Sequence, residues 1–106
     1  MDYLILSIDK PGQEHIRDRL RPQRIAWLEA NRKIIVAAGG IVDDRNRHVS
    51  GGLMIIKVSG REEAEKFAEA DPFTHASLYE STKIVRWRRV FFNFERVTAH
   101  DPFKAD

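Results

Sequence analysis

The order of the predicted strands and helices is the feature that most constrains what this chain can fold into. Strand-like segments, recognised by alternating or continuous apolar residues, lie at residues 3–8, 41–42, 53–58 and 82–94. Segments with helical periodicity lie at residues 13–20, 22–38 and 62–70. The resulting order of strand, helical segment, strand, strand, helix and strand is typical of a split βαβ fold. We therefore predict an α+β domain of ferredoxin-like βαββαβ topology with an antiparallel sheet.

Proline, glycine and capping residues indicate where the helices begin and end. Pro22 is expected to begin a long helix after a short one, because proline fits the first helical turn, and Gly39-Gly40 is expected to end it. Ser59 and Glu62 have the Ser-x-x-Glu spacing of a capping box. Asp71-Pro72 predicts the start of a further short helix, with the aspartate as its N-cap.

The predicted strands are apolar on both faces. In the first strand, Leu4, Leu6 and Ile8 lie on one face, and Tyr3 and Ile5 lie on the other. A sheet with two apolar faces needs a cover on each side, and two main helices cover only one of them. We therefore predict a homodimer in which the sheets of two copies face each other, and leave further assembly open.

Composition excludes several classes of function. The chain has no cysteine, so thiolate catalysis and disulfides are excluded, which fits a reducing cytoplasm. The 18 lysines and arginines oppose 16 acidic residues, so charge gives no reason to predict nucleic-acid binding. No segment resembles a signal peptide or a membrane span, and a cytoplasmic protein without a membrane partner is expected. No histidine or carboxylate cluster has metal-ligand spacing, so no metal site is expected.

The apolar pattern fades near the C-terminus. We predict one domain over residues 1–94 and a tail over residues 95–106. Before this boundary, Arg86-Trp87-Arg88-Arg89 interleaves cations with an aromatic ring, as single-strand nucleic-acid binders do. Strand alternation splits these charges between two faces, however, so Trp87 is expected in a barrel core or a dimer interface.

Several short motifs follow one another along the chain. They are Asp9-Lys10-Pro11-Gly12, Arg21-Pro22-x-x-Ile25-x-x-Leu28, Ala38-Gly39-Gly40, Glu62-Glu63-Ala64 and Ala70-Asp71-Pro72-Phe73, with Trp87 in the following strand. Taken in this order, they resemble the YciI-like (YCII-related) family. The similarity spans residues 1–92 and implies a dimeric α+β barrel with a cleft near the helix starts. It also implies a His–Asp acid–base pair, and some relatives act on aromatic degradation products.

The chain departs from this family at the histidine. Asp71 stands at the family's aspartate position, but the residue two positions after Pro22, where the family has histidine, is Arg24. A guanidinium cannot accept a proton near neutral pH as an imidazole can. Arg24 near Asp71 would favour the carboxylate form and weaken it as a base, so the family mechanism cannot be transferred intact.

The candidate site residues follow from these patterns. Asp71 is the candidate proton-transfer group, with the alternative that it only caps a helix. His75, one helical turn later, is the second catalytic candidate, with the alternative that it faces solvent. The candidate substrate-binding residues are Arg24, Arg21, Tyr3, Phe73 and Arg86.

Two functions remain open from the sequence. One is an enzyme that needs no cofactor and acts on a small anionic molecule, aromatic or lactone-like, with Asp71 moving the proton and Arg24 holding the anion. The other is a non-catalytic dimer that binds a metabolite or a partner protein. The arginine at the family's histidine position favours the second function, and an Arg24–Asp71 ion pair in a closed cleft would support it.

Overall fold

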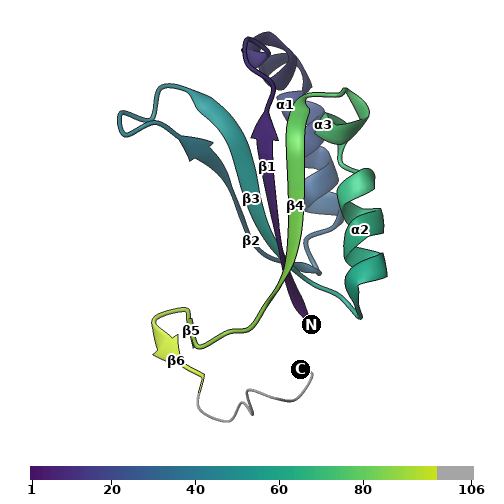
Figure 1. The fold of residues 1–106 in the computed structure, drawn as a ribbon, viewed down its shortest axis with the longest axis vertical. Coiled ribbons are helices and arrows are strands. Elements are labelled where there is room, and N and C mark those ends of the chain that lie inside the picture. The colour runs from purple at the N-terminus through teal and green to yellow at the C-terminus, as the bar shows by residue number, and fades with distance from the viewer. Residues whose placement is uncertain (98–106) are drawn as a thin grey trace.

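The computed structural model describes residues 1–97 of the 106-residue chain. Its elements are β1 (Asp2–Asp9), α1 (Glu14–Ala30), β2 (Ile35–Val42), β3 (Val49–Lys57), α2 (Arg61–Glu69), α3 (Pro72–His75), β4 (Tyr79–Trp87), β5 (Phe91–Phe92) and β6 (Glu95–Arg96). Strands β1 to β4 form one antiparallel sheet in the order β2-β3-β1-β4, and β5 pairs with β6 in a separate hairpin (Figure 1). The ferredoxin-like topology expected from the sequence is confirmed.

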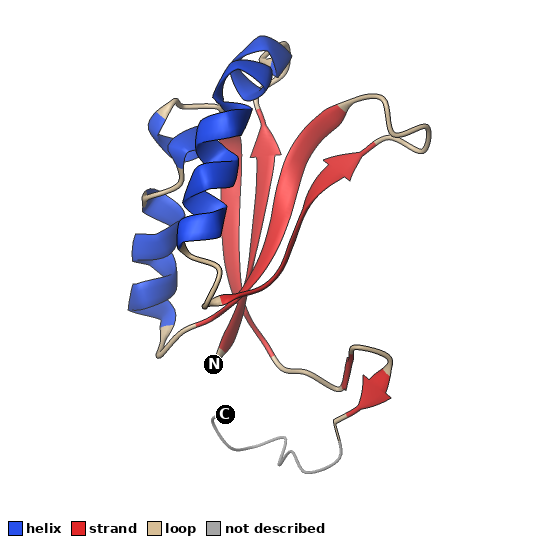
Figure 2. Cartoon of the chain, turned by 180° about the vertical axis from the view of Figure 1, so that it is seen from behind, coloured by secondary structure: helices blue, strands red, loops and turns tan. Residues whose placement is uncertain are grey.

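All three helices lie on one face of the sheet (Figure 2). The core between them is formed by Tyr3 and Ile5 from β1 and by Met54 and Ile56 from β3, which are all buried under α1 and α2. Each fully buried side chain of this size contributes about 1.5–3 kcal/mol. The two long helices contact each other through stacked rings of Trp27 and Phe67, whose centroids are 4.6 Å apart.

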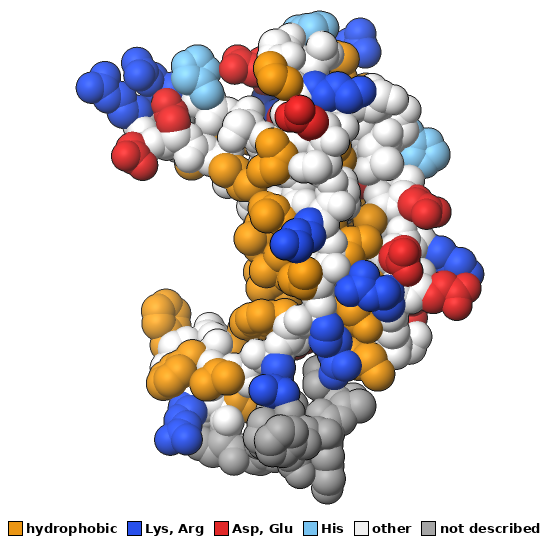
Figure 3. All heavy atoms as spheres, in the orientation of Figure 1, with side chains coloured by type: hydrophobic (Ala, Val, Ile, Leu, Met, Phe, Trp, Pro, Cys, Tyr) orange, Lys and Arg blue, Asp and Glu red, His pale blue; other side chains and the backbone are white. Residues whose placement is uncertain are grey.

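The opposite face of the sheet is also apolar, and no described helix covers it (Figures 1 and 2). The residues that alternate with the core positions point to this side, because successive strand residues face opposite ways. They include Leu4, Leu6, Leu53, Ile55, Val85 and Trp87. Figure 3 shows hydrophobic side chains gathered along this concave side, which we call the open face.

Helix α1 differs from the prediction at both of its expected boundaries. It is one helix that contains Pro22, where two helices had been predicted, and it ends at Ala30 rather than at Gly39. An internal proline removes one helical hydrogen bond and costs about 3 kcal/mol. Packing of Trp27 and Leu28 against the core keeps the chain helical past the proline. The side-chain amide of Asn31 then donates to the backbone carbonyl of Trp27 at 2.8 Å where the helix ends.

Strand β2 takes the place of the end of the predicted helix. Gly39 and Gly40 lie inside this strand, opposite Leu53 and Gly52 of β3, and do not cap a helix. Ile35, which lies within the predicted helix of residues 22–38, packs on the core from the sheet. The second strand is therefore longer than the two residues predicted.

Two predictions further along the chain also need correction. Helix α2 has Gly60 as its N-cap, and Ser59 donates its backbone N–H to Glu63 at 3.1 Å, so no capping box with Glu62 forms. Strand β4 ends at Trp87 and does not reach Phe94. The chain leaves the sheet after Trp87 and forms the β5–β6 hairpin, which spans the predicted boundary between residues 94 and 95.

The remainder of the predicted tail, residues 98–106, lies outside the described residues. Within residues 1–97, no helix has the length and hydropathy that crossing a membrane requires.

Candidate functional site

A cavity of about 260 Å³ lies between α1 and the β2–β3 side of the sheet. Its wall on the helix side carries the three arginines Arg17, Arg21 and Arg24. Their spacing of four and three residues places them on one face of α1. The remaining lining is mainly small or apolar and consists of Ile25, Leu28, Ala38, Gly39, Gly40, Val49, Gly52, Met54 and Phe73. The cavity therefore combines positive charge on one wall with apolar surface on the others.

Two glycines leave the space that the cavity occupies. Gly40 and Gly52 face each other across β2 and β3, at positions that alternate with the open-face residues and so point toward α1. A Cβ atom on Gly52 would meet the carbonyl oxygen of Gly39 at 3.4 Å, an ordinary contact. A larger side chain at Gly52 would therefore fit the backbone but fill the cavity, whereas a Cβ atom on Gly40 would lie 3.2 Å from Cγ1 of Val49, which would have to shift.

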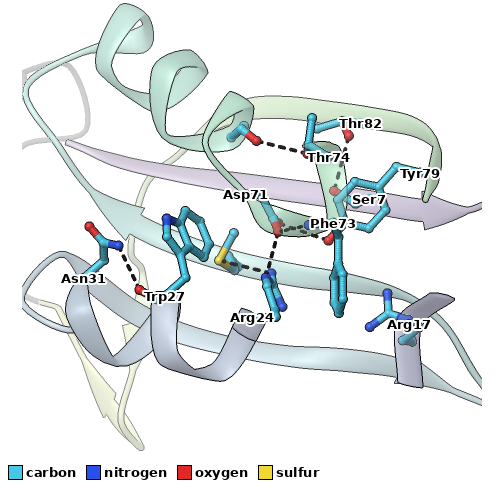
Figure 4. A network of polar contacts seen from close by, with 12 residues as sticks. Ser7, Arg17, Arg24, Trp27, Asn31, Asp71, Phe73, Thr74, Tyr79 and Thr82 are labelled. Carbon is cyan, nitrogen blue, oxygen red and sulfur yellow. Dashed lines mark hydrogen bonds and ion pairs between the residues drawn. The ribbon is translucent and has the colours of Figure 1, made fainter. Parts of the chain in front are cut away.

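Arg24 forms an ion pair with Asp71 at the inner end of the cavity (Figure 4). Its Nε lies 3.0 Å from Oδ1 of Asp71, and the two side chains are only 13% and 3% exposed. The Nε–H is not aligned for a hydrogen bond and has no other acceptor among the described residues. The one hydrogen bond that Nη2 makes within residues 1–97 is to the sulfur of Met54, at 3.8 Å, which is a weak acceptor. The guanidinium of Arg24 therefore retains hydrogen-bonding capacity at the cavity.

Asp71 is buried behind this arginine and does not line the cavity. As predicted, it is the N-cap of α3, where Oδ1 accepts the backbone N–H of Phe73 at 2.9 Å. Its Oδ2 accepts the hydroxyl of Tyr79 at 3.1 Å. Burial, together with the charge of Asp71, raises the pKa of Tyr79, so this phenol stays a proton donor. The carboxylate thus accepts two hydrogen bonds and is ion-paired with Arg24.

Arg17 is held at the other end of the same wall. Its Nε and Nη2 donate to the two carboxylate oxygens of Asp9 at 2.7 and 2.8 Å. Burial lowers the pKa of Arg17, but the hydrogen bond and charge of Asp9 outweigh this effect and raise it. The guanidinium of Arg17 lies 4.6 Å from the centroid of the Phe73 ring, and the guanidinium of Arg24 lies 5.0 Å from the same centroid. Such contacts fix the orientation of both arginines.

The structure brings together only some of the predicted site residues. Arg21, Arg24 and Phe73 line the cavity, and Arg21 pairs at the exposed surface with Asp18 at 2.9 Å. Tyr3 lies in the core, with Arg61 over its ring at 5.8 Å. The side chains of His75 and Arg86 are exposed on α3 and β4, and the cavity lining includes none of these last three residues.

Two residues of the site were not predicted from the sequence. The position of Arg17 could have been noticed, because it shares a helix face with Arg21 and Arg24. Tyr79 gave no comparable signal, since its contact with Asp71 depends on the turn between α3 and β4. Within the described residues, no cluster of histidine, aspartate and glutamate side chains could hold a metal ion.

The fold and the cavity define a ferredoxin-like α+β protein with an arginine-lined pocket beneath its first helix. The sequence profile of the YCII-related domain matches residues 1–88, and the chain belongs to this family. A search of functionally curated proteins gave no match.

Solved structures with a similar fold include the following two. One is 5-chloro-2-hydroxyhydroquinone dehydrochlorinase (TftG) from Burkholderia phenoliruptrix AC1100, in complex with 2,5-dihydroxybenzoquinone. It is 30% identical, with a TM-score of 0.75 over 83% of this chain and 94% of that protein. The second is an antibiotic biosynthesis monooxygenase, 15% identical with a TM-score of 0.50 over 84% of this chain and 97% of that one, which shows likeness of fold alone.

Proposed function

We propose that the cavity binds a small planar organic anion of the hydroxyquinone or phenolate type, and that the protein acts on it as an enzyme. The observation that carries this proposal is the row of Arg17, Arg21 and Arg24 along an otherwise apolar cavity. Guanidinium groups form charge-assisted hydrogen bonds with anionic oxygens, and apolar walls suit an aromatic ring. A dry cavity of about 150 Å³ can hold benzene, so about 260 Å³ accommodates one substituted ring.

The structural similarity to TftG supports the choice of ligand. That protein is named for its action on a chlorinated hydroxyhydroquinone, and its structure contains a dihydroxybenzoquinone. Both compounds are single rings with oxygen substituents that can carry negative charge. A cavity with several guanidinium groups suits this chemistry better than it suits a neutral or cationic ligand.

The arginines would favour the ionised form of a ring hydroxyl. Each 1.36 kcal/mol of additional interaction with the anion lowers the pKa of the bound hydroxyl by one unit. An ionised ring oxygen pushes electron density into the ring, so that a ring carbon carrying chloride takes up a proton from water. The resulting keto tautomer expels chloride while a second ring hydroxyl loses its proton to water, and the net loss is HCl. In this proposal Asp71 does not transfer the proton, because it lies behind Arg24, with which it is ion-paired, and already accepts two hydrogen bonds. It is a positioning residue for Arg24.

The binding proposal is tested with 2,5-dihydroxybenzoquinone in isothermal titration calorimetry. Hydrogen bonds to charged groups contribute about 1.5–3 kcal/mol, so Arg21→Gln and Arg24→Gln should each raise Kd by roughly 10- to 100-fold. Arg19→Gln is the matched control, because Arg19 is an exposed arginine of the same helix outside the cavity lining. Equal affinity in wild type and both cavity variants would overturn the proposal.

A non-catalytic binding protein is the second candidate function. The buried Arg24–Asp71 ion pair favours it, because it leaves no carboxylate or imidazole among the described cavity-lining residues to act as a base. The two candidates separate in an assay of chloride release from a chlorinated hydroxyhydroquinone. Turnover that Arg21→Gln reduces supports the enzyme, whereas tight binding without turnover of any hydroxylated aromatic tested supports the binding protein.

We also infer a homodimer that pairs through the open face. Its apolar side chains, including Leu4, Ile55 and Trp87, have no cover within the described chain, and a second copy supplies one of identical shape. Sedimentation velocity should give the mass of a dimer for the wild type and of a monomer for Ile55→Glu. A monomeric wild type at micromolar concentration would contradict this inference.

A further inference from the structure

The hairpin of β5 and β6 exposes large aromatic side chains. We call residues 88–97 the arm. Its two strands have two residues each, and the turn between them places Asn93 and Phe94 at φ angles of +53° and +67°. Phe94 is fully exposed, and Phe91 is 66% exposed. A two-stranded hairpin of this size is at best marginally stable alone in water, so the arm needs a surface to pack against.

The base of the arm is fixed to the body of the protein. Arg89 donates from Nε and Nη2 to the two oxygens of the buried Asp2, at 2.6 and 3.2 Å. The ring of Phe92 lies 4.2 Å from the same guanidinium. The hairpin itself stands away from the main sheet on the side of the open face, opposite the helices (Figures 1 and 2). Its direction is therefore set, while Phe91 and Phe94 extend from it.

A groove next to the cavity offers an apolar surface. We call it the rim groove; its volume is about 370 Å³, and it is lined by Ile25, Leu28, Glu29, Arg32, Ile35 and Ala38. It shares Ile25, Leu28 and Ala38 with the cavity, so the two spaces adjoin. Ile25 is 52% exposed, and β2 is the edge strand of the sheet. The cavity is thus open to solvent along this rim.

The arm and the rim groove are complementary in charge as well as in polarity. The exposed pair Glu95 and Arg96 follows Phe94 in the arm, and the exposed pair Glu29 and Arg32 borders the apolar part of the groove. Glu95 can pair with Arg32 and Arg96 with Glu29. Exposed pairs such as Glu29–Arg32 stabilise a protein only weakly, so their exchange for intermolecular pairs meets little resistance.

We propose that the arm of one copy docks in the rim groove of a second copy and closes the open side of its cavity. Within one chain the arm projects on the open-face side (Figures 1 and 2), whereas the groove is lined by residues of α1, of β2 and of the turn between them. Two copies that pair through their open faces place each arm next to the other copy. An aromatic side chain from the partner then completes the binding site and excludes water from it. This inference rests on the proposed function of the cavity.

A cysteine cross-link tests the docking without reference to any ligand. The natural chain has no cysteine, so Ile25→Cys together with Phe94→Cys introduces the only two thiols. Mild oxidation should convert this variant to a covalent dimer, whereas the control pair Val42→Cys and Phe94→Cys should stay uncross-linked, because Val42 lies outside the groove. An intramolecular disulfide, or the same yield of covalent dimer in both variants, would overturn the proposal.

Subunit mixing tests whether the docked arm completes the binding site. The variant with Phe91→Ser and Phe94→Ser should bind 2,5-dihydroxybenzoquinone at least ~10-fold more weakly than wild type or Val42→Ser. In a mixed dimer with an Arg24→Gln subunit, the intact arm of that subunit docks on the intact cavity of the arm variant. After equal amounts are mixed at random, about a quarter of all cavities should therefore recover tight binding. No recovery would refute completion in trans. If the wild type does not bind the quinone, the proposed function fails, and the cross-link still tests whether the arm docks in the rim groove of a second copy.

Discussion

Replacing Asp71 with asparagine should show that this carboxylate acts as a fixed counter-charge for Arg24. The two side chains are 3% and 13% exposed, with 3.0 Å between Oδ1 and Nε. Removing one partner of a buried ion pair typically costs 3–5 kcal/mol, because the other charge stays buried without compensation. Arg24 also borders the cavity and can reach water there, so we expect a loss of about 2–3 kcal/mol, or roughly 10–20 °C in Tm.

Asparagine isolates the effect of the charge because it is also a good N-cap. It can still accept the backbone N–H of Phe73, which Asp71 accepts at 2.9 Å. Urea unfolding measures the change, with an unchanged m value as the sign that the unfolded states are alike. Glu62→Gln is the control, since it breaks an exposed pair with Lys66 and should cost less than about 0.5 kcal/mol.

A double variant completes the test. Arg24→Met combined with Asp71→Asn removes both charges and should recover much of the stability that the single change loses. An Asp71→Asn protein as stable as wild type would refute the counter-charge argument. If that variant kept wild-type ligand affinity but lost all turnover, Asp71 would be a proton-transfer group and not a positioning residue.

Three further predictions concern the cavity, the buried phenol and the loop between β2 and β3. Gly52→Val should abolish quinone binding without lowering Tm, because its Cβ makes only an ordinary 3.4 Å contact while its methyl groups fill the cavity; a lowered Tm or retained binding would contradict this. Tyr79→Phe should cost about 1.5–3 kcal/mol near pH 7, because it removes the hydrogen bond to Asp71. Because the pKa of Tyr79 is raised in the fold, the contribution of its hydroxyl to the free energy of unfolding is fully present below about pH 10 and is lost as pH rises further. The stabilities of wild type and Tyr79→Phe, measured by urea titration, should therefore converge in alkali. The backbone N–H groups of Arg47 and His48 lower the pKa of Asp43, so their amide NMR signals should shift only as pH falls below about 4, through the lowered pKa, and Asp43→Asn should remove that transition.

The sheet could be predicted from the sequence because its signal is local and repeated. Alternation in β1 assigns Tyr3 and Ile5 to one face and Leu4 and Leu6 to the other, and the structure places them so. Helix boundaries were harder to predict from the sequence because tertiary packing determines them. Pro22 remains inside α1, since the core contacts of Trp27 and Leu28 favour the longer helix. Gly39 and Gly40 could end a helix or lie in an edge strand, and only pairing with β3 separates the two.

One part of the site could be predicted because the position of a single residue, Arg24, has a chemical role in the family. Arginine in place of the family's histidine indicated an Arg24–Asp71 contact, which the structure contains. The cavity itself depends on glycines of two strands and on a helix from another part of the chain, so no local pattern indicated it. The role of Arg17 requires a tight turn of the chain after β1, which brings Arg17 of α1 next to Asp9 at the end of that strand. Such contacts follow from the assembled fold and leave little trace in sequence spacing.

The exchange of histidine for arginine changes how such a pocket can depend on pH. An imidazole near a carboxylate gains and loses its proton within the physiological range, so it can transfer protons but also loses its charge. The guanidinium of Arg24 keeps its charge, and the same holds for Arg17 and Arg21 along the same wall. In the proposed function, a pocket built in this way would hold an anion at constant strength across that range, and the ionisation of the ligand would be the pH-dependent event. Catalysis in it would rest on stabilising a negative charge that the substrate itself develops.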